Sequence, residues 1–239
     1  MEPEGIRLID ALLDKRPIPP DLQARLSDAD ALAERREREA RQRADDWPAL
    51  SRYRDANAAV REPDLVMIGD SLTEIWRIAM PEMFGDAIVN RGIAGQTSPQ
   101  ILLRFMQDVV DLRPRAVHIL CGTNDVAGNT GPNLPEDYQR NVRAMVDIAT
   151  ANGIDVLLGG IPPAAHIFWQ PDAQPLEWIP RLNAWLADRA NGRTIRFIDY
   201  HTALNDGQGA LQDRFSADGV HVTRTAYLVM RTMLEQMLD

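Results

Sequence analysis

Five short apolar runs, rich in β-branched residues, recur between residues 65 and 199 of this 239-residue chain. Each run has the length of a buried strand, and stretches of helical periodicity separate most of them. The predicted strands are residues 65–68, 87–90, 116–121, 155–161 and 195–199. The predicted helices are residues 98–110, 136–151, 176–189 and 223–238, with a further one beginning near Leu72. Alternating strands and helices predict a three-layer α/β/α fold, in which helices cover both faces of a parallel five-stranded sheet.

Residues 1 to about 60 have a different pattern. Ile6, Ile9 and Leu13 stand at helical spacing, which predicts a short amphipathic helix that ends at the prolines of residues 17–20. Residues 28–46 carry dense mixed charge, as on a solvated helix face. We therefore predict a helical N-terminal extension, residues 1–60, and a second domain, residues 61–239.

One apolar stripe lies at the end of this extension. Its members stand three residues apart, as on one face of a helix, and they are Trp47, Leu50, Tyr53 and Ala56. We expect the stripe to pack on the second domain. The alternative is a surface for self-association, so the chain could form a homo-oligomer through its N-terminal extension.

Composition narrows the partners and the compartment. A formal net charge of −9 argues against nucleic acid as a partner. The first residues are acidic, no secretory apolar segment follows them, and no run approaches the length of a membrane span. We therefore expect a cytoplasmic protein without integral membrane association. The single cysteine, Cys121, excludes an internal disulfide, and we expect it to be buried and inert.

Ser71 directly follows the predicted strand 65–68, Gly69 and Asp70, at the start of a helical stretch. Unpaired backbone N–H groups at a helix N-terminus point toward such a hydroxyl. The serine could therefore attack an acyl carbon while these groups hold the resulting oxyanion. Alternatively, Ser71 and Glu74 have the spacing of a helix capping box, and the motif alone favours that structural role.

A serine nucleophile needs a base, and the base needs an acid. Asp218 and His221 stand three residues apart near the C-terminus. On a helical turn this spacing brings the two side chains to one face, with Cβ atoms roughly 5–6 Å apart. A turn with a surface histidine is the alternative. A rival acid and base are Asp199 and His201, at the end of the last predicted strand, whereas His118 lies within an apolar strand and is expected to be a core residue.

Two further segments follow predicted strands and offer oxyanion donors. Asn124 follows strand 116–121 and carries an amide N–H₂ group. Gly95 follows strand 87–90 and offers a backbone N–H that no side chain obstructs. A turn or helix cap at Asn124 and a flexible loop at Gly95 are the structural alternatives. Ligands bind at the carboxyl ends of strands in open α/β sheets, so we expect these groups to meet there.

The four segments together resemble the sequence blocks of the GDSL, or SGNH, hydrolase superfamily of esterases and lipases. The blocks read Gly69-Asp70-Ser71-Leu72, Gly92-Ile93-Ala94-Gly95-Gln96-Thr97, Gly122-Thr123-Asn124-Asp125 and Asp218-Gly219-Val220-His221. Within the superfamily, the local sequence is similar to that of bacterial lysophospholipase-like acylhydrolases and of platelet-activating-factor acetylhydrolase subunits. The strand order that we expect, 2-1-3-4-5, is also that of the superfamily, which shares it with flavodoxin-like folds.

The resemblance implies a role for each block. It implies Ser71 as nucleophile, His221 as base and Asp218 as acid. It further implies an oxyanion hole made by the Ser71 N–H, the Gly95 N–H and the Asn124 side chain. Gln96 stands where many members carry Asp, which should change the hydrogen bonding of its loop but leaves the Gly95 donor in place.

Substrate contacts are expected from Asp70 and from a proline-rich aromatic loop, residues 162–171, which follows strand 155–161. Phe168 and Trp169 in this loop, with Trp178 beyond it, could line the pocket or could instead cover the core. The four histidines lack metal-ligand spacing, and we expect no metal and no other cofactor.

We therefore predict a serine ester hydrolase that forms a covalent acyl-enzyme on Ser71 and accepts a small-molecule ester with a short acyl group. A carbohydrate O-acetyl esterase, a lysophospholipase and a thioesterase fit the same residues. A non-catalytic flavodoxin-like binding module is the alternative from another class.

Overall fold

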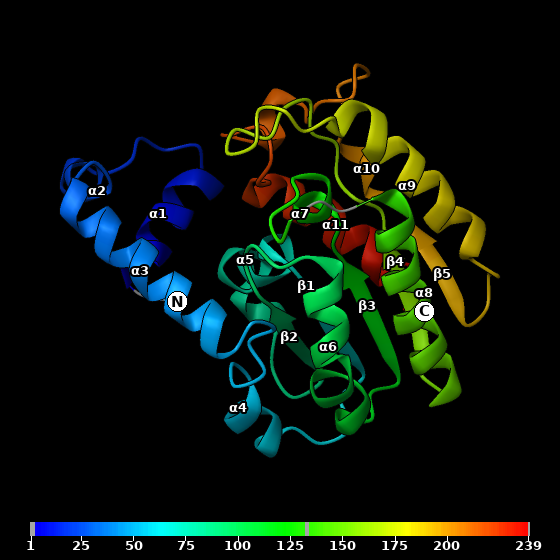
Figure 1. The fold of residues 1–239 in the computed structure, drawn as a ribbon. Coiled ribbons are helices and arrows are strands. Elements are labelled where there is room, and N and C mark those ends of the chain that lie inside the picture. Colours follow the sequence, from blue (N-terminus) through cyan, green and yellow to red (C-terminus); the bar gives the residue numbers. More distant parts are fainter. Residues whose placement is uncertain (1–2, 132–133, 239) are drawn as a thin grey trace.

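A computed structural model describes residues 3–131 and 134–238. Within these residues, five parallel strands form one sheet in the order β2-β1-β3-β4-β5 (Figure 1). The strands are β1 (Leu65–Gly69), β2 (Ile88–Gly92), β3 (Ala116–Leu120), β4 (Asp155–Gly159) and β5 (Ile195–Ile198). The predicted strand order and the three-layer α/β/α arrangement are confirmed.

Helices cover both faces of the sheet. One face packs against α5 (Ser71–Ala79), α10 (Tyr200–Leu204) and α11 (Arg224–Glu235). The other packs against α6 (Ser98–Asp108), α8 (Pro135–Ala151) and α9 (Pro175–Arg189). Shorter segments complete the chain, namely α7 (Thr123–Val126) and the 3-10 turns η1 (Pro81–Met83), η2 (Val110–Leu112) and η3 (Asp213–Phe215).

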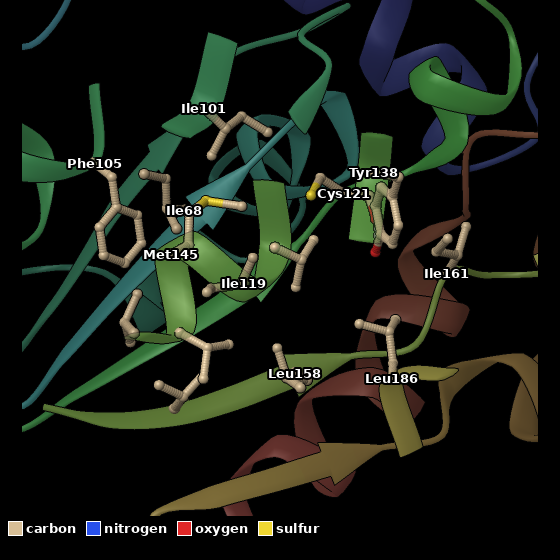
Figure 2. Packing of buried hydrophobic residues seen from close by; sticks show 14 of the residues in the cluster. Ile68, Ile101, Phe105, Ile119, Cys121, Tyr138, Met145, Leu158, Ile161 and Leu186 are labelled. Carbon is tan, nitrogen blue, oxygen red and sulfur yellow. Dashed lines mark hydrogen bonds between the residues drawn. The ribbon is translucent and has the colours of Figure 1, made fainter. Parts of the chain in front are cut away.

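The core forms two clusters, one on each face of the sheet. Successive side chains of a strand point to opposite faces, so Val66 and Ile68 enter one cluster while Leu65 and Met67 enter the other. Figure 2 shows the first cluster, in which Ile68 and Ile119 from the strands meet Ile101 and other helix side chains. Both faces are covered, which is why these strands read as continuous apolar runs without polar alternation.

The N-terminal region is helical, as predicted. It contains α1 (Pro3–Leu13), α2 (Pro20–Leu26), α3 (Ala29–Asp45) and α4 (Arg54–Ala59), and the first three stand together at one side of the molecule (Figure 1). Leu13 of α1 joins the second core cluster, and Arg224 of α11 forms ion pairs with Asp10 and Asp14. These contacts hold α1 against the second domain. The division of the chain at residue 60 and self-association through the N-terminal extension stay predictions.

The predicted helical stripe from Trp47 to Ala56 is wrong. Residues 47–53 form turns, and α4 begins only at Arg54. Three glutamine side chains bind the backbone carbonyls of this connector: Gln96 donates to Pro48, Gln100 to Trp47 and Gln107 to Leu50. The connector does pack on the second domain, as we expected of the stripe, both through these polar contacts and through the buried side chain of Tyr53.

Close approach of α5 to β2 requires a glycine at the end of β2. A Cβ atom at Gly92 would lie 2.1 Å from the Glu74 backbone nitrogen, whereas one at Gly85 would meet nothing within 4 Å. We expect Gly92→Ala to lower the free energy of unfolding by at least about 2 kcal/mol, because overpacking against backbone forces the helix and strand apart. Gly85→Ala, the matched control, should stay within about 0.5 kcal/mol of the wild type. Urea unfolding followed by circular dichroism measures both, and equal midpoints for the two variants would contradict this packing.

Candidate active site

Ser71 is the first residue of α5, at the carboxyl edge of β1. The residue that caps the helix is Asp70, whose Oδ1 accepts from the Leu72 N–H at 3.0 Å. The capping-box alternative for Ser71 and Glu74 is therefore wrong, and the Ser71 hydroxyl is left for other contacts. Among the described residues, the Ser71 backbone N–H has no acceptor.

The C-terminal segment brings an imidazole to this hydroxyl. Ser71 Oγ lies 3.2 Å from His221 Nε2, and His221 Nδ1 lies 2.8 Å from Asp218 Oδ2. The three side chains thus form one continuous hydrogen-bonded chain across 150 residues of sequence. All three are partly exposed, so the chain ends at a surface that a substrate can reach.

A loop, not a helical turn, places Asp218 and His221, so the predicted local conformation is wrong although their proximity is right. Asp218 Oδ1 accepts from the backbone N–H groups of Val220 at 2.9 Å and His221 at 2.7 Å. Ser216 Oγ accepts from the Gly219 N–H at 2.8 Å and donates to the His221 carbonyl at 2.7 Å. Gly219 has a φ of +83°, which suits glycine.

The environment of Asp218 favours its ionised form. Partial burial raises the pKa of this carboxyl, but the hydrogen bond and charge of His221 and two backbone N–H groups outweigh burial and lower the pKa overall. An ionised Asp218 holds His221 Nδ1 as the protonated nitrogen and leaves Nε2 free to accept from Ser71.

The loop between β2 and α6 presents the Gly95 N–H. Gly95 has a φ of +78°, and a Cβ there would meet open space, so conformation rather than crowding requires the glycine. The polar groups around it are engaged: the Ala94 N–H donates to Glu74 Oε2 at 2.8 Å, and the Gln96 N–H to the Ile93 carbonyl at 3.3 Å. In the described chain, the Gly95 N–H itself has no acceptor.

Asn124 lies between the Ser71 turn and the Gly95 loop. It is buried in α7, and its Nδ2 donates to the Gln96 carbonyl at 3.0 Å and lies 3.4 Å from Asp70 Oδ2. The three expected oxyanion donors are therefore gathered at neighbouring strand ends of β1, β2 and β3.

A buried guanidinium joins the same strand ends. Arg104 of α6 is fully buried and donates to the carbonyls of Gly69 and Arg91, at 3.0 and 2.7 Å. It also donates to Gln96 Oε1 at 2.7 Å and pairs with Asp108 at 3.0 Å. Gln96, which departs from the family pattern, thus connects the Gly95 loop to Arg104 and to the connector carbonyl of Pro48.

The aromatic loop between β4 and α9 lies over the imidazole, and it is a loop as predicted. The Trp169 ring stacks on His221 with centroids 6.3 Å apart and an interplanar angle of 26°. Phe168 is 63% exposed and packs edge-on against Trp169. Trp169 and, from α9, Trp178 both pack against the first core cluster as well. Asp70 is only 1% exposed, which leaves its carboxyl as a helix cap beneath the surface.

The rival acid is used elsewhere. Asp199 Oδ1 caps α10 by accepting from the Thr202 N–H at 2.9 Å. His118 is a core residue, as predicted; burial lowers its pKa to about 3, and its Nε2 lies 3.1 Å from the Tyr200 hydroxyl. Burial also raises the pKa of the Cys121 thiol, which agrees with the expected inert cysteine.

Sequence reasoning missed three residues that support the site. They are Arg104, Asn129 and, beyond its suspected capping role, Glu74, which also pairs with Arg52 at 3.0 Å. Apart from Asp108, which lies four residues after Arg104 in α6, their partners are backbone atoms or side chains from other elements, so local motifs mark them poorly. A charged residue at a helix position that faces the core was the one available signal for Arg104.

Two kinds of feature are absent from the part of the chain that the structure describes. Within residues 3–131 and 134–238, no three His, Cys, Asp or Glu side chains gather where they could hold a metal ion. Among the helices in that same part of the chain, none combines the length and apolarity that a membrane span requires.

Comparisons with known proteins agree with this geometry. Residues 67–229 match the model of the GDSL-like lipase/acylhydrolase family. A Bacteroides thetaiotaomicron structure described as a GDSL-like lipase is 36% identical, with a TM-score of 0.75 over 80% of this chain and 97% of the other. A Bacteroides fragilis structure assigned as an acylhydrolase is 38% identical, with a TM-score of 0.76 over 81% of this chain and 97% of the other.

A curated relative shows the same likeness at lower identity. The platelet-activating factor acetylhydrolase IB subunit alpha1 of Bos taurus is 27% identical over 205 residues, which cover 80% of this chain and 82% of the relative. The chain belongs to the GDSL-like lipase/acylhydrolase family. It is an ester hydrolase, and the alternative of a non-catalytic binding module is set aside.

The buried carboxyl of Asp70 generates a prediction about stability. Burial raises its pKa to about 7, from about 3.9 in an unfolded chain. Between these values the unfolded state releases the proton while the folded state keeps it, so the contribution of Asp70 to the free energy of unfolding falls as the pH rises from 4 to 7. Asp70→Asn keeps a capping oxygen and removes the titration. Urea unfolding from pH 4 to 8 measures the free energy of unfolding of both proteins. The difference, variant minus wild type, should increase up to about pH 7 and then stay constant. Parallel curves would contradict the shift.

Proposed function

We propose that this protein is a serine esterase that cleaves a small carboxylic ester through a covalent acyl-enzyme on Ser71. The observation that carries the proposal is the hydrogen-bonded chain from Asp218 through His221 to Ser71 Oγ, with distances of 2.8 and 3.2 Å. A serine is activated when a base accepts its proton and an acid stabilises the charged base. The three hydrogen-bonded side chains stand in this order of acid, base and serine.

In the acylation step, His221 Nε2 takes the proton of Ser71 Oγ as the oxygen attacks the ester carbonyl. The carbonyl π electrons move to oxygen and produce a tetrahedral oxyanion. Asp218 stabilises the imidazolium that forms. When the intermediate collapses, the bond to the alcohol breaks, and His221 gives its proton to the leaving alkoxide, so the alcohol departs neutral.

The oxyanion is stabilised by donors that the folded chain holds ready. The N–H groups of Ser71 and Gly95 have no acceptor within the described residues, and the Asn124 N–H₂ group lies between them. Donors oriented before the reaction avoid the cost of reorganisation as charge develops. Asp70 caps α5 and so holds the helix start that carries Ser71. We therefore assign it a positioning role rather than a substrate contact.

In the deacylation step, water takes the place of the alcohol. His221 removes a proton from the water as it attacks the acyl carbon, and the bond to Ser71 Oγ breaks. The serine recovers its proton from His221, and the carboxylic acid leaves.

Short acyl groups are the favoured substrates in this proposal. The Trp169 ring stacks on His221, and the exposed Phe168 ring packs against Trp169, so two aromatic rings lie beside the base. The Bos taurus relative is named as an acetylhydrolase, which supports the same preference.

The proposal is tested with p-nitrophenyl esters from acetyl to long-chain acyl, together with acetylated sugars. We expect the highest kcat/KM for acetyl or other short acyl groups and a near-complete loss of activity in Ser71→Ala, since the nucleophile is then missing. Ser27→Ala removes a surface hydroxyl that bonds only within α2 and its cap, so it serves as the matched control. Retained turnover in a folded Ser71→Ala protein would refute the nucleophile, and a clear preference for long acyl chains would refute the assigned substrate.

A second prediction concerns the Asn124 amide. Removing one oxyanion donor typically lowers kcat by about 100–1000-fold, and we expect this of Asn124→Ala. KM for a short ester should change little, because the donor acts mainly in the transition state. Steady-state kinetics on the acetyl ester measure both constants, and an unchanged kcat in the folded variant would remove Asn124 from the oxyanion hole.

A further inference from the structure

The Asn124 side chain can serve as an oxyanion donor in only one of its two orientations. A carboxamide is nearly symmetric in shape, yet one end donates hydrogen bonds and the other accepts them. If the amide turned over, its oxygen would face the developing oxyanion and repel it. The Gln96 carbonyl, which can only accept, binds the nitrogen end of the amide, and a donor at the oxygen end would complete the productive orientation.

Trp169 determines the orientation of a neighbouring amide. Its Nε1–H lies 2.9 Å from the Asn129 side chain, and an indole nitrogen can only donate. The atom of Asn129 that faces Trp169 is therefore the oxygen. The N–H₂ group of Asn129 must point the other way.

Asn129 passes this orientation on to Asn124. Its Nδ2 donates to Asn124 Oδ1 at 2.8 Å and to the Gly95 carbonyl at 3.2 Å. The Asn124 oxygen is thereby engaged by Asn129, and the Asn124 N–H₂ group faces the Gln96 carbonyl and Asp70. The backbone N–H of Asn129 also donates to the Asn124 carbonyl at 3.1 Å, which keeps the two residues side by side.

We propose that Asn129 is a positioning residue of the oxyanion hole, and that the donor-only indole of Trp169 sets its orientation. This inference rests on the proposed function, because it assigns Asn129 the task of presenting the Asn124 and Gly95 donors. Trp169 also stacks on His221, so one side chain both packs against the base and, through Asn129, orients the donors.

The decisive substitution is Asn129→Asp. A carboxylate still accepts from Trp169 but cannot donate to Asn124 Oδ1 or to the Gly95 carbonyl. Asn124 then turns its N–H₂ group toward the new carboxylate and away from the substrate. We expect kcat for the acetyl ester to fall by about 100–1000-fold, as for loss of the donor itself. KM should stay within about threefold of wild type.

Two milder variants grade the effect. Asn129→Ala removes the support without imposing the wrong orientation, and Trp169→Phe removes the indole donor but keeps an aromatic ring over His221. Each should lower kcat by about three- to tenfold, in line with the loss of one hydrogen bond between neutral groups. Asn191→Asp adds the same charge at a surface turn before β5 and is the matched control, with kcat unchanged.

The double variant separates positioning from a general loss of structure. If Asn129 acts mainly through Asn124, adding Asn129→Asp to Asn124→Ala should lower kcat by less than about tenfold further. A kcat within twofold of wild type for folded Asn129→Asp, or losses that simply multiply in the double variant, would overturn the inference. Ser71-dependent turnover by the wild type would leave the proposed function standing in either case.

A spectroscopic measurement tests the hydrogen bonds without reference to turnover. The indole N–H signal of Trp169 in a ¹H–¹⁵N spectrum is identified by its absence from Trp169→Phe. We expect this signal to shift in Asn129→Ala, where its acceptor is gone, and to stay in place in Asn191→Asp. If the signal does not move in Asn129→Ala, the inference is overturned, whether or not any ester is hydrolysed. If the signal shifts but no Ser71-dependent hydrolysis is found, the proposed function alone is refuted.

Discussion

The buried guanidinium of Arg104 is the constraint on which the geometry of this edge of the sheet depends. It donates to the carbonyl of Gly69, the last residue of β1, to the carbonyl of Arg91 near the end of β2, and to the side chain of Gln96. A buried charge is costly unless it is paired and hydrogen-bonded, and Asp108 completes that requirement. The Ser71 turn and the Gly95 loop are therefore fixed relative to each other by one side chain of α6. Any movement that separates them leaves a charge without partners, which makes the arrangement stiff.

The layers of the fold could be predicted because local pattern and global packing agree. The run around Val66 and Ile68 is apolar on both faces, which suits only a strand covered by helices on both sides. Boundaries were less predictable. Ile161 is apolar and follows β4, yet its N–H and carbonyl bond the Asn183 side chain instead of a neighbouring strand. The connector has helical spacing of apolar residues but no helix before Arg54, since its carbonyls bind distant glutamines.

The residues proposed for the reaction could be read from motifs, whereas their supports could not. Ser71, His221 and Asn124 stand in short recognisable segments at strand ends or in the C-terminal block. Asn129 looks like an ordinary turn residue, and its importance emerges only when Trp169, 40 residues further on, is in place. The local conformation around Asp218 was also beyond the pattern, because a three-residue spacing suits a helical turn and an Asx-type loop equally well.

The connector before β1 is held in part by its main chain. Gln100 and Gln107 reach the carbonyls of Trp47 and Leu50, and every residue type supplies such an oxygen. The information that docks these two positions therefore resides on α6, at some distance along the chain. Two connector side chains add their own contacts, since Tyr53 is buried and donates to the Gly92 carbonyl, and Arg52 pairs with Glu74. The exposed side chain of Trp47 is free to diverge, or to be redesigned for a tag or a fused partner, as long as the path of the main chain is kept. Exchange of the glutamines would loosen this part of the segment even though its own composition had not changed.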